Sequence, residues 1–279
     1  MDIANRFTTA TWNDFERDGY LRLGRTLDRD GLSALQDRID AYMEQRLSGD
    51  RLMMQLDLGG DYAAMAEMTT GSKGATLEYR KIERLETDPL FLTYLQEPIF
   101  RDACVRTYGD IDIAIMRAMF MNKPARKGTL LPWHQDGGTG WGLDRHPLLT
   151  VWTALDPATI ANGCVQIIPG SHRLGLLSER GHTITQEMEA LHCRPERIVH
   201  LELDAGESVL LHNWVLHRSD VNRTDRPRRA FSCCYMDGRT RQRTSGTTYP
   251  IVFRGSSRAP AAAGVPVQDN QRCEPSTTP

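Results

Sequence analysis

The second half of the chain is built from short apolar segments separated by Gly, Pro and Asn, and this pattern restricts the possible folds more than any other feature. Segments of this length and spacing predict the strands of an antiparallel β-sheet. Helical patterns precede them. Helices followed by many short strands predict a mainly β barrel or sandwich with a covering of N-terminal helices. The predicted strands are 111–122, 148–155, 164–168, 198–203, 208–212 and 229–236.

Apolar spacing and capping residues locate the helices in the first half. Residues 9–19 predict a short helix that leads into a strand at 20–23. A longer helix is expected from the N-cap Asp28 to Gly49, and a further helical stretch from Asp88 to Gly109. Residues 50–75 have no clean period, so they are either a loop over the mouth of a site or an irregular surface segment.

The composition changes near residue 253, where the chain becomes rich in Gly, Ser, Ala, Pro and Gln. Such a stretch cannot bury enough apolar surface to order itself. We therefore expect one domain over residues 1–253, which is within the size of a jelly-roll with helical cover, and a disordered tail over residues 254–279.

Charge, cysteine usage and hydropathy exclude several classes of protein. A formal net charge of −2 gives no electrostatic footprint for nucleic acid or an anionic membrane. No apolar run is long enough for a membrane span, and the first residues lack the pattern of a signal peptide. The six cysteines show no C-x-x-C pair or disulfide-framework spacing, which favours reduced thiols in a cytoplasmic protein. We expect a small-molecule partner, and the oligomeric state stays open.

The segment Trp133-His134-Gln135-Asp136 carries a pattern typical of metal sites. On a strand, residues two positions apart point to the same face, so His134 and Asp136 can reach one ion. A second histidine would complete the two-histidine, one-carboxylate triad of non-haem Fe(II) oxygenases, which leaves positions open for other ligands. His212 and His217 are the candidates, and the closer spacing of His217 to a following strand favours His217.

That following strand opens with two adjacent arginines, Arg228 and Arg229, which must face opposite sides of the sheet. An arginine fork suits a carboxylate, so an arginine beside an open iron site fits a 2-oxo acid co-substrate. Arg228 shares its face with the small residues Ala230 and Ser232, which suit the interior of a ligand-holding barrel. This pattern favours Arg228 as the carboxylate anchor.

Several separated motifs, in this order, resemble the phytanoyl-CoA dioxygenase (PhyH-like) family of Fe(II)/2-oxoglutarate-dependent oxygenases, over about residues 20–237. They are Tyr79 with Lys81-Ile82, Met119-Phe-Met-Asn-Lys-Pro124, Trp133-His-Gln-Asp136, Val151-Trp-Thr-Ala-Leu155, Asn162-Gly-Cys164, Ile168-Pro-Gly-Ser-His172, and His217-Arg-Ser219 followed by Arg228.

The resemblance implies a double-stranded β-helix, a cupin-like jelly-roll with metal ligands at its open mouth. It implies Fe(II), 2-oxoglutarate and O₂ as reactants, with ascorbate as the reductant in vitro. The implied iron ligands are His134, Asp136 and His217, which would also be the catalytic residues. The implied 2-oxoglutarate contacts are Lys81, Met119, Gln135, Trp152, Ser219 and Arg228.

The expected activity is oxidation of a small molecule with release of succinate and CO₂, by hydroxylation, desaturation or ring closure. A carboxylate at Asp136 argues against a halogenase, because a small residue there would leave an iron position for chloride. We favour a specialised metabolite of a natural-product pathway, such as an antibiotic pathway, as substrate. The alternatives are an acyl-CoA hydroxylase, a cupin-like metalloenzyme without 2-oxoglutarate, and a non-catalytic jelly-roll. Polar residues expected near the substrate are Trp141, Asp144, Arg145, His146 and Arg239.

Overall fold

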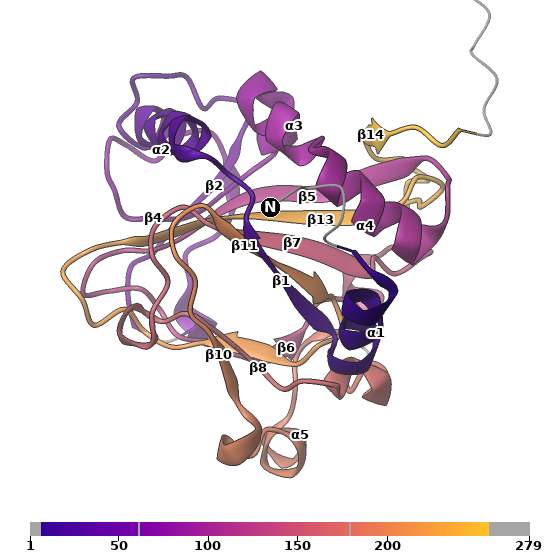
Figure 1. Ribbon diagram of the computed structural model, residues 1–279. Coiled ribbons are helices and arrows are strands. Elements are labelled where there is room, and N and C mark those ends of the chain that lie inside the picture. The colour runs from indigo at the N-terminus through magenta and orange to yellow at the C-terminus, as the bar shows by residue number, and fades with distance from the viewer. Residues whose placement is uncertain (1–6, 61, 179, 257–279) are drawn as a thin grey trace, which may run out of the picture.

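The computed structural model describes residues 7–60, 62–178 and 180–256. Within these residues two antiparallel sheets face each other (Figure 1). The larger, nine-stranded sheet has the order β1 (Tyr20–Arg25), β11 (Glu207–His212), β7 (Leu149–Ala154), β13 (Arg228–Asp237), β5 (Ile113–Lys123), β4 (Tyr79–Glu83), β2 (Met53–Leu56) and β3 (Thr69–Thr70), with β14 (Ile251–Phe253) also paired to β5. The smaller sheet has the order β10 (Val199–Leu201), β8 (Val165–Ile167), β12 (His217–Ser219), β6 (Leu131–Gln135) and β9 (His182–Thr183).

Helices cover the outer face of the larger sheet, as Figure 1 shows for α2, α3 and α4. Asp28 and Asp88 cap α2 and α3 through side-chain oxygens that accept backbone N–H bonds, as their positions in the sequence predicted. The helices of the described residues are α1 (Thr9–Asp18), α2 (Arg29–Met43), α3 (Pro89–Leu95), α4 (Pro98–Tyr108) and α5 (Gln186–His192).

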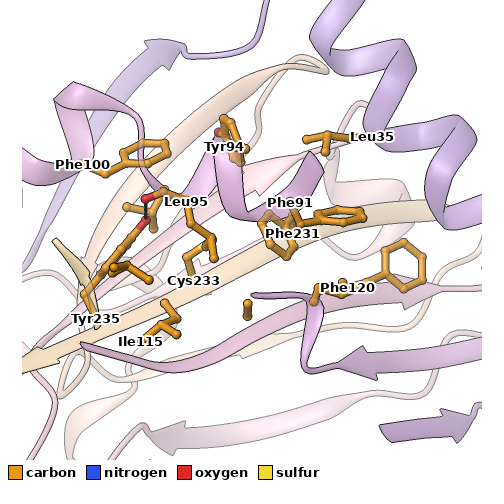
Figure 2. Packing of buried hydrophobic residues seen from close by; sticks show 14 of the residues in the cluster. Leu35, Phe91, Tyr94, Leu95, Phe100, Ile115, Phe120, Phe231, Cys233 and Tyr235 are labelled. Atoms are coloured by element: carbon orange, nitrogen blue, oxygen red, sulfur yellow. Dashed lines mark hydrogen bonds between the residues drawn. The ribbon is translucent and has the colours of Figure 1, made fainter. Parts of the chain in front are cut away.

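The main hydrophobic core lies between these helices and the larger sheet. Phe231 of β13 packs against Phe91 of α3 with ring centroids 4.8 Å apart, and Tyr94 and Phe100 continue the aromatic layer (Figure 2). Alternation along β13 sends Phe231, Cys233 and Tyr235 into this layer. Arg228 and Ser232 therefore point to the opposite face, where they line the pocket between the sheets. The predicted mainly β, cupin-like jelly-roll with helical cover is confirmed.

The structure corrects the predicted end of the second helix. The sequence pattern extended this helix to Gly49, but α2 ends at Met43. Gln45 takes a left-handed φ of 60°, and the Leu47 N–H turns back to the Ala41 carbonyl. The chain therefore leaves the helix axis at Glu44, and Leu47, which continued the apolar spacing, is exposed.

Residues 50–75 form more regular structure than their sequence indicated, because β2 and β3 extend the edge of the larger sheet. Asp57, after β2, is buried and accepts hydrogen bonds from the backbone N–H and hydroxyl of Thr129. Residues 254–256 of the predicted tail bond to the loop after α4, for example through the N–H of Gly255 and Asp112. The rest of that predicted tail lies outside the described residues.

Two further findings concern the cysteines and the helices. The described cysteines are buried free thiols, at positions 104, 164, 193, 233 and 234. Among the described helices, none combines the length and the apolar character needed to cross a bilayer.

Candidate active site

The two strands β6 and β12 bring three potential metal ligands together between the sheets. His134 and His217 are register partners across this antiparallel pair, and Asp136 follows the last residue of β6. The ligand atoms of these three residues all lie within 4.8 Å of one another, and His217 Nε2 is 3.9 Å from Asp136 Oδ2. The arrangement has the composition of a two-histidine, one-carboxylate metal site.

Backbone carbonyls set the orientation of both imidazole rings. The Nδ1 atom of His134 is 2.8 Å from the Pro132 carbonyl oxygen, and Nδ1 of His217 is 2.9 Å from the Val215 carbonyl oxygen. A carbonyl can only accept, so Nδ1 carries the proton and the Nε2 lone pair is left for a metal. Burial, followed by the charge of His217, holds the pKa of His134 well below its usual range, which keeps this ring neutral as metal binding requires.

A third histidine, His182 of β9, lies beside the cluster. Its ring is edge-on to His134 with centroids 4.7 Å apart, and its Nε2 is 2.5 Å from the hydroxyl of Tyr62. Two glycines permit this placement, because a Cβ on Gly138 would lie 2.3 Å from the backbone nitrogen of Gly181, and both have positive φ. Tyr62 belongs to the 50–75 segment, so that segment reaches the site.

Arg228, the first residue of β13, supplies a buried hydrogen-bond donor to the same pocket. The side chain is 2% exposed, and its guanidinium lies over the Trp152 ring, 5.4 Å from the centroid. Arg228 Nε and Nη1 and Trp152 Nε1 are buried without a hydrogen-bond partner among the described residues. Burial lowers the pKa of Arg228 to about 10. Buried donors of this kind are costly unless a ligand satisfies them.

Arg229 has the opposite environment, as alternation along the strand predicted. It points toward α2, where Nε and Nη2 pair with the two carboxylate oxygens of Asp156 at 2.8 Å and Nη1 binds Asp40 at 2.6 Å. Its donors are therefore used for structure, whereas those of Arg228 face the pocket.

Most of the predicted 2-oxoglutarate contacts lie around this pocket. Lys81, Met119, Trp152, Ser219 and Arg228 line it together with the three metal-ligand candidates. Burial, and then the charges of Arg117 and Arg80, lower the pKa of Lys81 to about 7. The structure therefore places these five side chains around one pocket.

Gln135 is the exception, because the structure does not bring it to the pocket. Its side-chain amide donates to the carbonyls of Gly175 and Trp214, and its side-chain oxygen accepts from the N–H of Leu177. Since His134 and Asp136 face the pocket, the residue between them faces the other way. Gln135 ties neighbouring loops to β6 and has no side-chain oxygen or nitrogen directed at the ligand cluster.

The residues expected near the substrate lie in three different places. Trp141, in the loop after the metal strand, lines the pocket, and the guanidinium of Arg117 lies 5.0 Å from its ring centroid. Asp144, Arg145 and Arg239 instead line a separate surface groove. His146 lines neither of these and packs against Trp214.

Sequence reasoning missed two pocket residues with clear roles in its geometry, Arg117 and His182. Alternation could have found Arg117, because it lies two positions before Met119 on the same strand and so shares its face. His182 had no such signal, because it lies on a two-residue strand that follows a glycine and takes a φ of 74°. His212 also lines the pocket, but its Nδ1 accepts the Trp214 N–H and it is outside the ligand cluster.

The residues present fit an iron ion and a 2-oxo dicarboxylate. Two neutral imidazoles and a carboxylate leave coordination positions open, and a 2-oxo acid group can chelate a metal there. A distal carboxylate would satisfy the partnerless N–H groups of Arg228.

Comparisons with known proteins identify the family of the chain. The family model described as phytanoyl-CoA dioxygenase (PhyH) matches residues 15–230. A Caenorhabditis elegans protein described as "Probable phytanoyl-CoA dioxygenase" is 26% identical over 243 residues, which cover 79% of this chain and 72% of the relative. The Bos taurus phytanoyl-CoA dioxygenase domain-containing protein 1 is 25% identical over 263 residues, covering 80% of this chain and 88% of the relative.

Solved structures with the same fold include EctD and SnoK. EctD from S. alaskensis, crystallised with 2-oxoglutarate and 5-hydroxyectoine, superposes with a TM-score of 0.67 at 21% identity, covering 92% of this chain and 86% of EctD. SnoK, an α-ketoglutarate-dependent carbocyclase from nogalamycin biosynthesis, superposes with a TM-score of 0.66 at 19% identity, covering 87% and 88%. The chain therefore belongs to the phytanoyl-CoA dioxygenase family and is a 2-oxoglutarate-dependent non-haem iron oxygenase.

Proposed function

We propose that this oxygenase oxidises a small-molecule specialised metabolite of a natural-product pathway, with release of succinate and CO₂. The observation that carries the proposal is the single pocket that combines the cluster of His134, Asp136 and His217 with the unsatisfied guanidinium of Arg228. SnoK, which shares this fold and is described as a carbocyclase from nogalamycin biosynthesis, is the reason for choosing a specialised metabolite over a fatty acyl-CoA.

In this proposal His134, Asp136 and His217 hold Fe(II), and Arg228 and Ser219 bind the distal carboxylate of 2-oxoglutarate. Trp152 and Met119 form walls of the co-substrate site, and the Lys81 amine lines the same pocket. The iron and co-substrate together would supply an oxidant strong enough to remove hydrogen from a substrate carbon. Gln135 is not retained as a contact, because its side-chain hydrogen bonds are all made with backbone groups.

The protein side chains contribute orientation and exclusion of water. The carbonyls of Pro132 and Val215 hold the Nδ1 protons of the two histidines, so both Nε2 lone pairs stay directed at the cluster. The site lies between two packed sheets, and His134 is only 3% exposed. Hydroxylation is the default outcome, with desaturation or ring closure from the same abstraction where the substrate is held differently.

Three alternatives differ in how much of this site they would use. A cupin-like metalloenzyme without 2-oxoglutarate would leave the partnerless donors of Arg228 and Trp152 without a purpose. An acyl-CoA hydroxylase shares the whole site and differs only in substrate. A non-catalytic jelly-roll would not need a complete set of metal ligands. As part of the proposal we retain a cytoplasmic location, which the buried free thiols support.

The test is succinate release from 2-oxoglutarate with Fe(II), ascorbate and O₂, measured with and without a panel of specialised metabolites and with an acyl-CoA. We expect iron-dependent succinate that one metabolite stimulates and that His217→Ala abolishes, with a product changed in mass by one oxygen or two hydrogens. Stimulation by the acyl-CoA alone would replace our substrate class. Bound metal with no succinate under any condition would refute the co-substrate assignment.

A further inference from the structure

Arg117 of β5 is a pocket residue that the proposed iron and co-substrate sites do not use. Its guanidinium lies over the Trp141 ring, and its side chain is 22% exposed. It forms a long ion pair with Asp136, whose Oδ1 is 3.8 Å from Arg117 Nη2, but it makes no hydrogen bond with the residues that the structure describes. A metal on Asp136 would draw charge from that oxygen and leave Arg117 less compensated still.

Register places Arg117 away from the carboxylate anchor. Along β5 Arg117 pairs with Cys234 and Lys123 pairs with Arg228, so the two arginines are separated by six residues of strand. At the usual rise this is roughly 20 Å between backbones. Arg117 and Arg228 therefore line the same pocket at well separated positions along the strands, and Arg117 is the arginine that lies beside Asp136.

The polar groups near Arg117, other than its ion-pair partner Asp136, are bonded to one another. The Thr150 hydroxyl donates to Asn213 Oδ1 at 2.9 Å, and the Asn213 amide donates to the Cys234 sulfur at 3.2 Å. These neighbours satisfy one another. An arginine that lines a pocket, with its plane fixed by an aromatic ring and its donors unused, is suited to a bidentate carboxylate.

The charge of the pocket points the same way. Its described lining residues include three arginines, Arg117, Arg218 and Arg228, against the single carboxylate of Asp136. Bound iron and 2-oxoglutarate carry equal and opposite formal charge, so they leave this excess positive charge in place. A substrate with its own negative charge would compensate it.

We propose that Arg117, supported by Trp141, binds a carboxylate of the substrate, so that the enzyme acts on an anionic, carboxylate-bearing small molecule. The inference rests on the proposed function, because it assumes that the co-substrate occupies the Arg228 side of the pocket. It adds a specificity residue and a substrate class that the metal cluster by itself does not define.

The experiment uses full-length protein loaded with Mn(II) and 2-oxoglutarate, and compares benzoate and 3-phenylpropionate with benzamide and 3-phenylpropanamide by ligand-observed NMR titration. We expect the acids to bind at least about tenfold more tightly than the amides, as one charge-assisted pair provides. Arg117→Met should remove that difference, and Arg117→Lys should retain part of it. Arg239→Met is the control, because it removes a surface arginine already paired with Asp237 outside this pocket.

Equal binding of acids and amides to the parent protein, absence of acid binding, or unchanged acid binding in Arg117→Met would each overturn the inference. The melting temperature of every sample is also measured with and without 2-oxoglutarate. If only Arg117→Met loses the 2-oxoglutarate response, Arg117 belongs to the co-substrate site and the inference is wrong. If the parent protein has no response, the proposed function itself fails.

Discussion

Replacing Arg228 with methionine should have opposite effects on the free protein and on its complex with 2-oxoglutarate. In the free protein Arg228 is a buried cation with two N–H groups that have no partner among the described residues. Its pKa is lowered to about 10 by burial, so folding the charged form costs free energy at neutral pH, and this cost falls only as the pH rises above about 10. The variant without ligand should be at least as stable as the parent.

The complex should behave in the opposite way. With 2-oxoglutarate at a hundred times its Kd, linkage stabilises the parent by about 2.7 kcal/mol, which raises the Tm of a chain this size by roughly 5 to 11 °C. Loss of one partner of a buried charge pair costs about 2–5 kcal/mol of binding, or at least about thirtyfold in Kd. At the same ligand concentration the variant should keep at most about 0.9 kcal/mol, a Tm rise of roughly 3 °C or less.

The assay is a thermal melt with Mn(II), with and without 2-oxoglutarate. Arg229→Met is the matched control, because it removes the adjacent arginine on the opposite face. It breaks the ion pairs with Asp156 and Asp40, so it should lower stability by about 2 kcal/mol or more and leave the 2-oxoglutarate shift intact. A full shift in Arg228→Met, or a shift lost only in Arg229→Met, would refute the assignment of the anchor.

Three further predictions follow from the described contacts. His134→Ala should lose metal binding and iron-dependent turnover by at least about a hundredfold with an unchanged circular dichroism spectrum, and normal turnover would contradict the ligand assignment. Asp57→Ala should lower the unfolding free energy by about 2–4 kcal/mol in urea titrations, because it leaves the buried Thr129 N–H without its acceptor. A loss below about 0.5 kcal/mol would contradict a stabilising role for the Asp57 carboxylate. The pKa of Lys81 is lowered to about 7 in the folded state, so the unfolded chain binds more protons between about pH 7 and 10. The stability of the free protein should therefore rise over that pH range because of this group. Lys81→Met should remove this contribution, and an unchanged pH profile of stability in the variant would contradict it.

The fold was largely predictable because its strands and helices carry strong local signals. The segments 148–155, 208–212 and 229–236 coincide closely with β7, β11 and β13, each bounded by turn-forming residues. The second helix was extended too far because apolar spacing continues to Leu47, and only the left-handed Gln45 shows that the chain has turned. Short edge strands such as β3 and β9 depend on their partners, so their own sequence does not reveal them.

The site was predictable where alternation and motif order agree. Alternation separates Arg228 from Arg229, and the structure places them on opposite faces. The same rule, applied to Gln135, would have turned it away from the pocket that His134 and Asp136 face, and the family resemblance alone suggested otherwise. His182 and Tyr62 come together only through the approach of two distant loops, for which one sequence holds no signal.

The most direct test of the central claim is an anaerobic calorimetric titration of 2-oxoglutarate into the protein with Fe(II), without metal, and in Asp136→Ala. If the cluster of His134, Asp136 and His217 holds the iron to which 2-oxoglutarate binds as a chelating ligand, one 2-oxoglutarate should bind per chain with Fe(II). Its binding should weaken at least about a hundredfold without metal or in the variant. Binding of equal affinity with and without metal, or no binding to the iron-loaded protein, would contradict it.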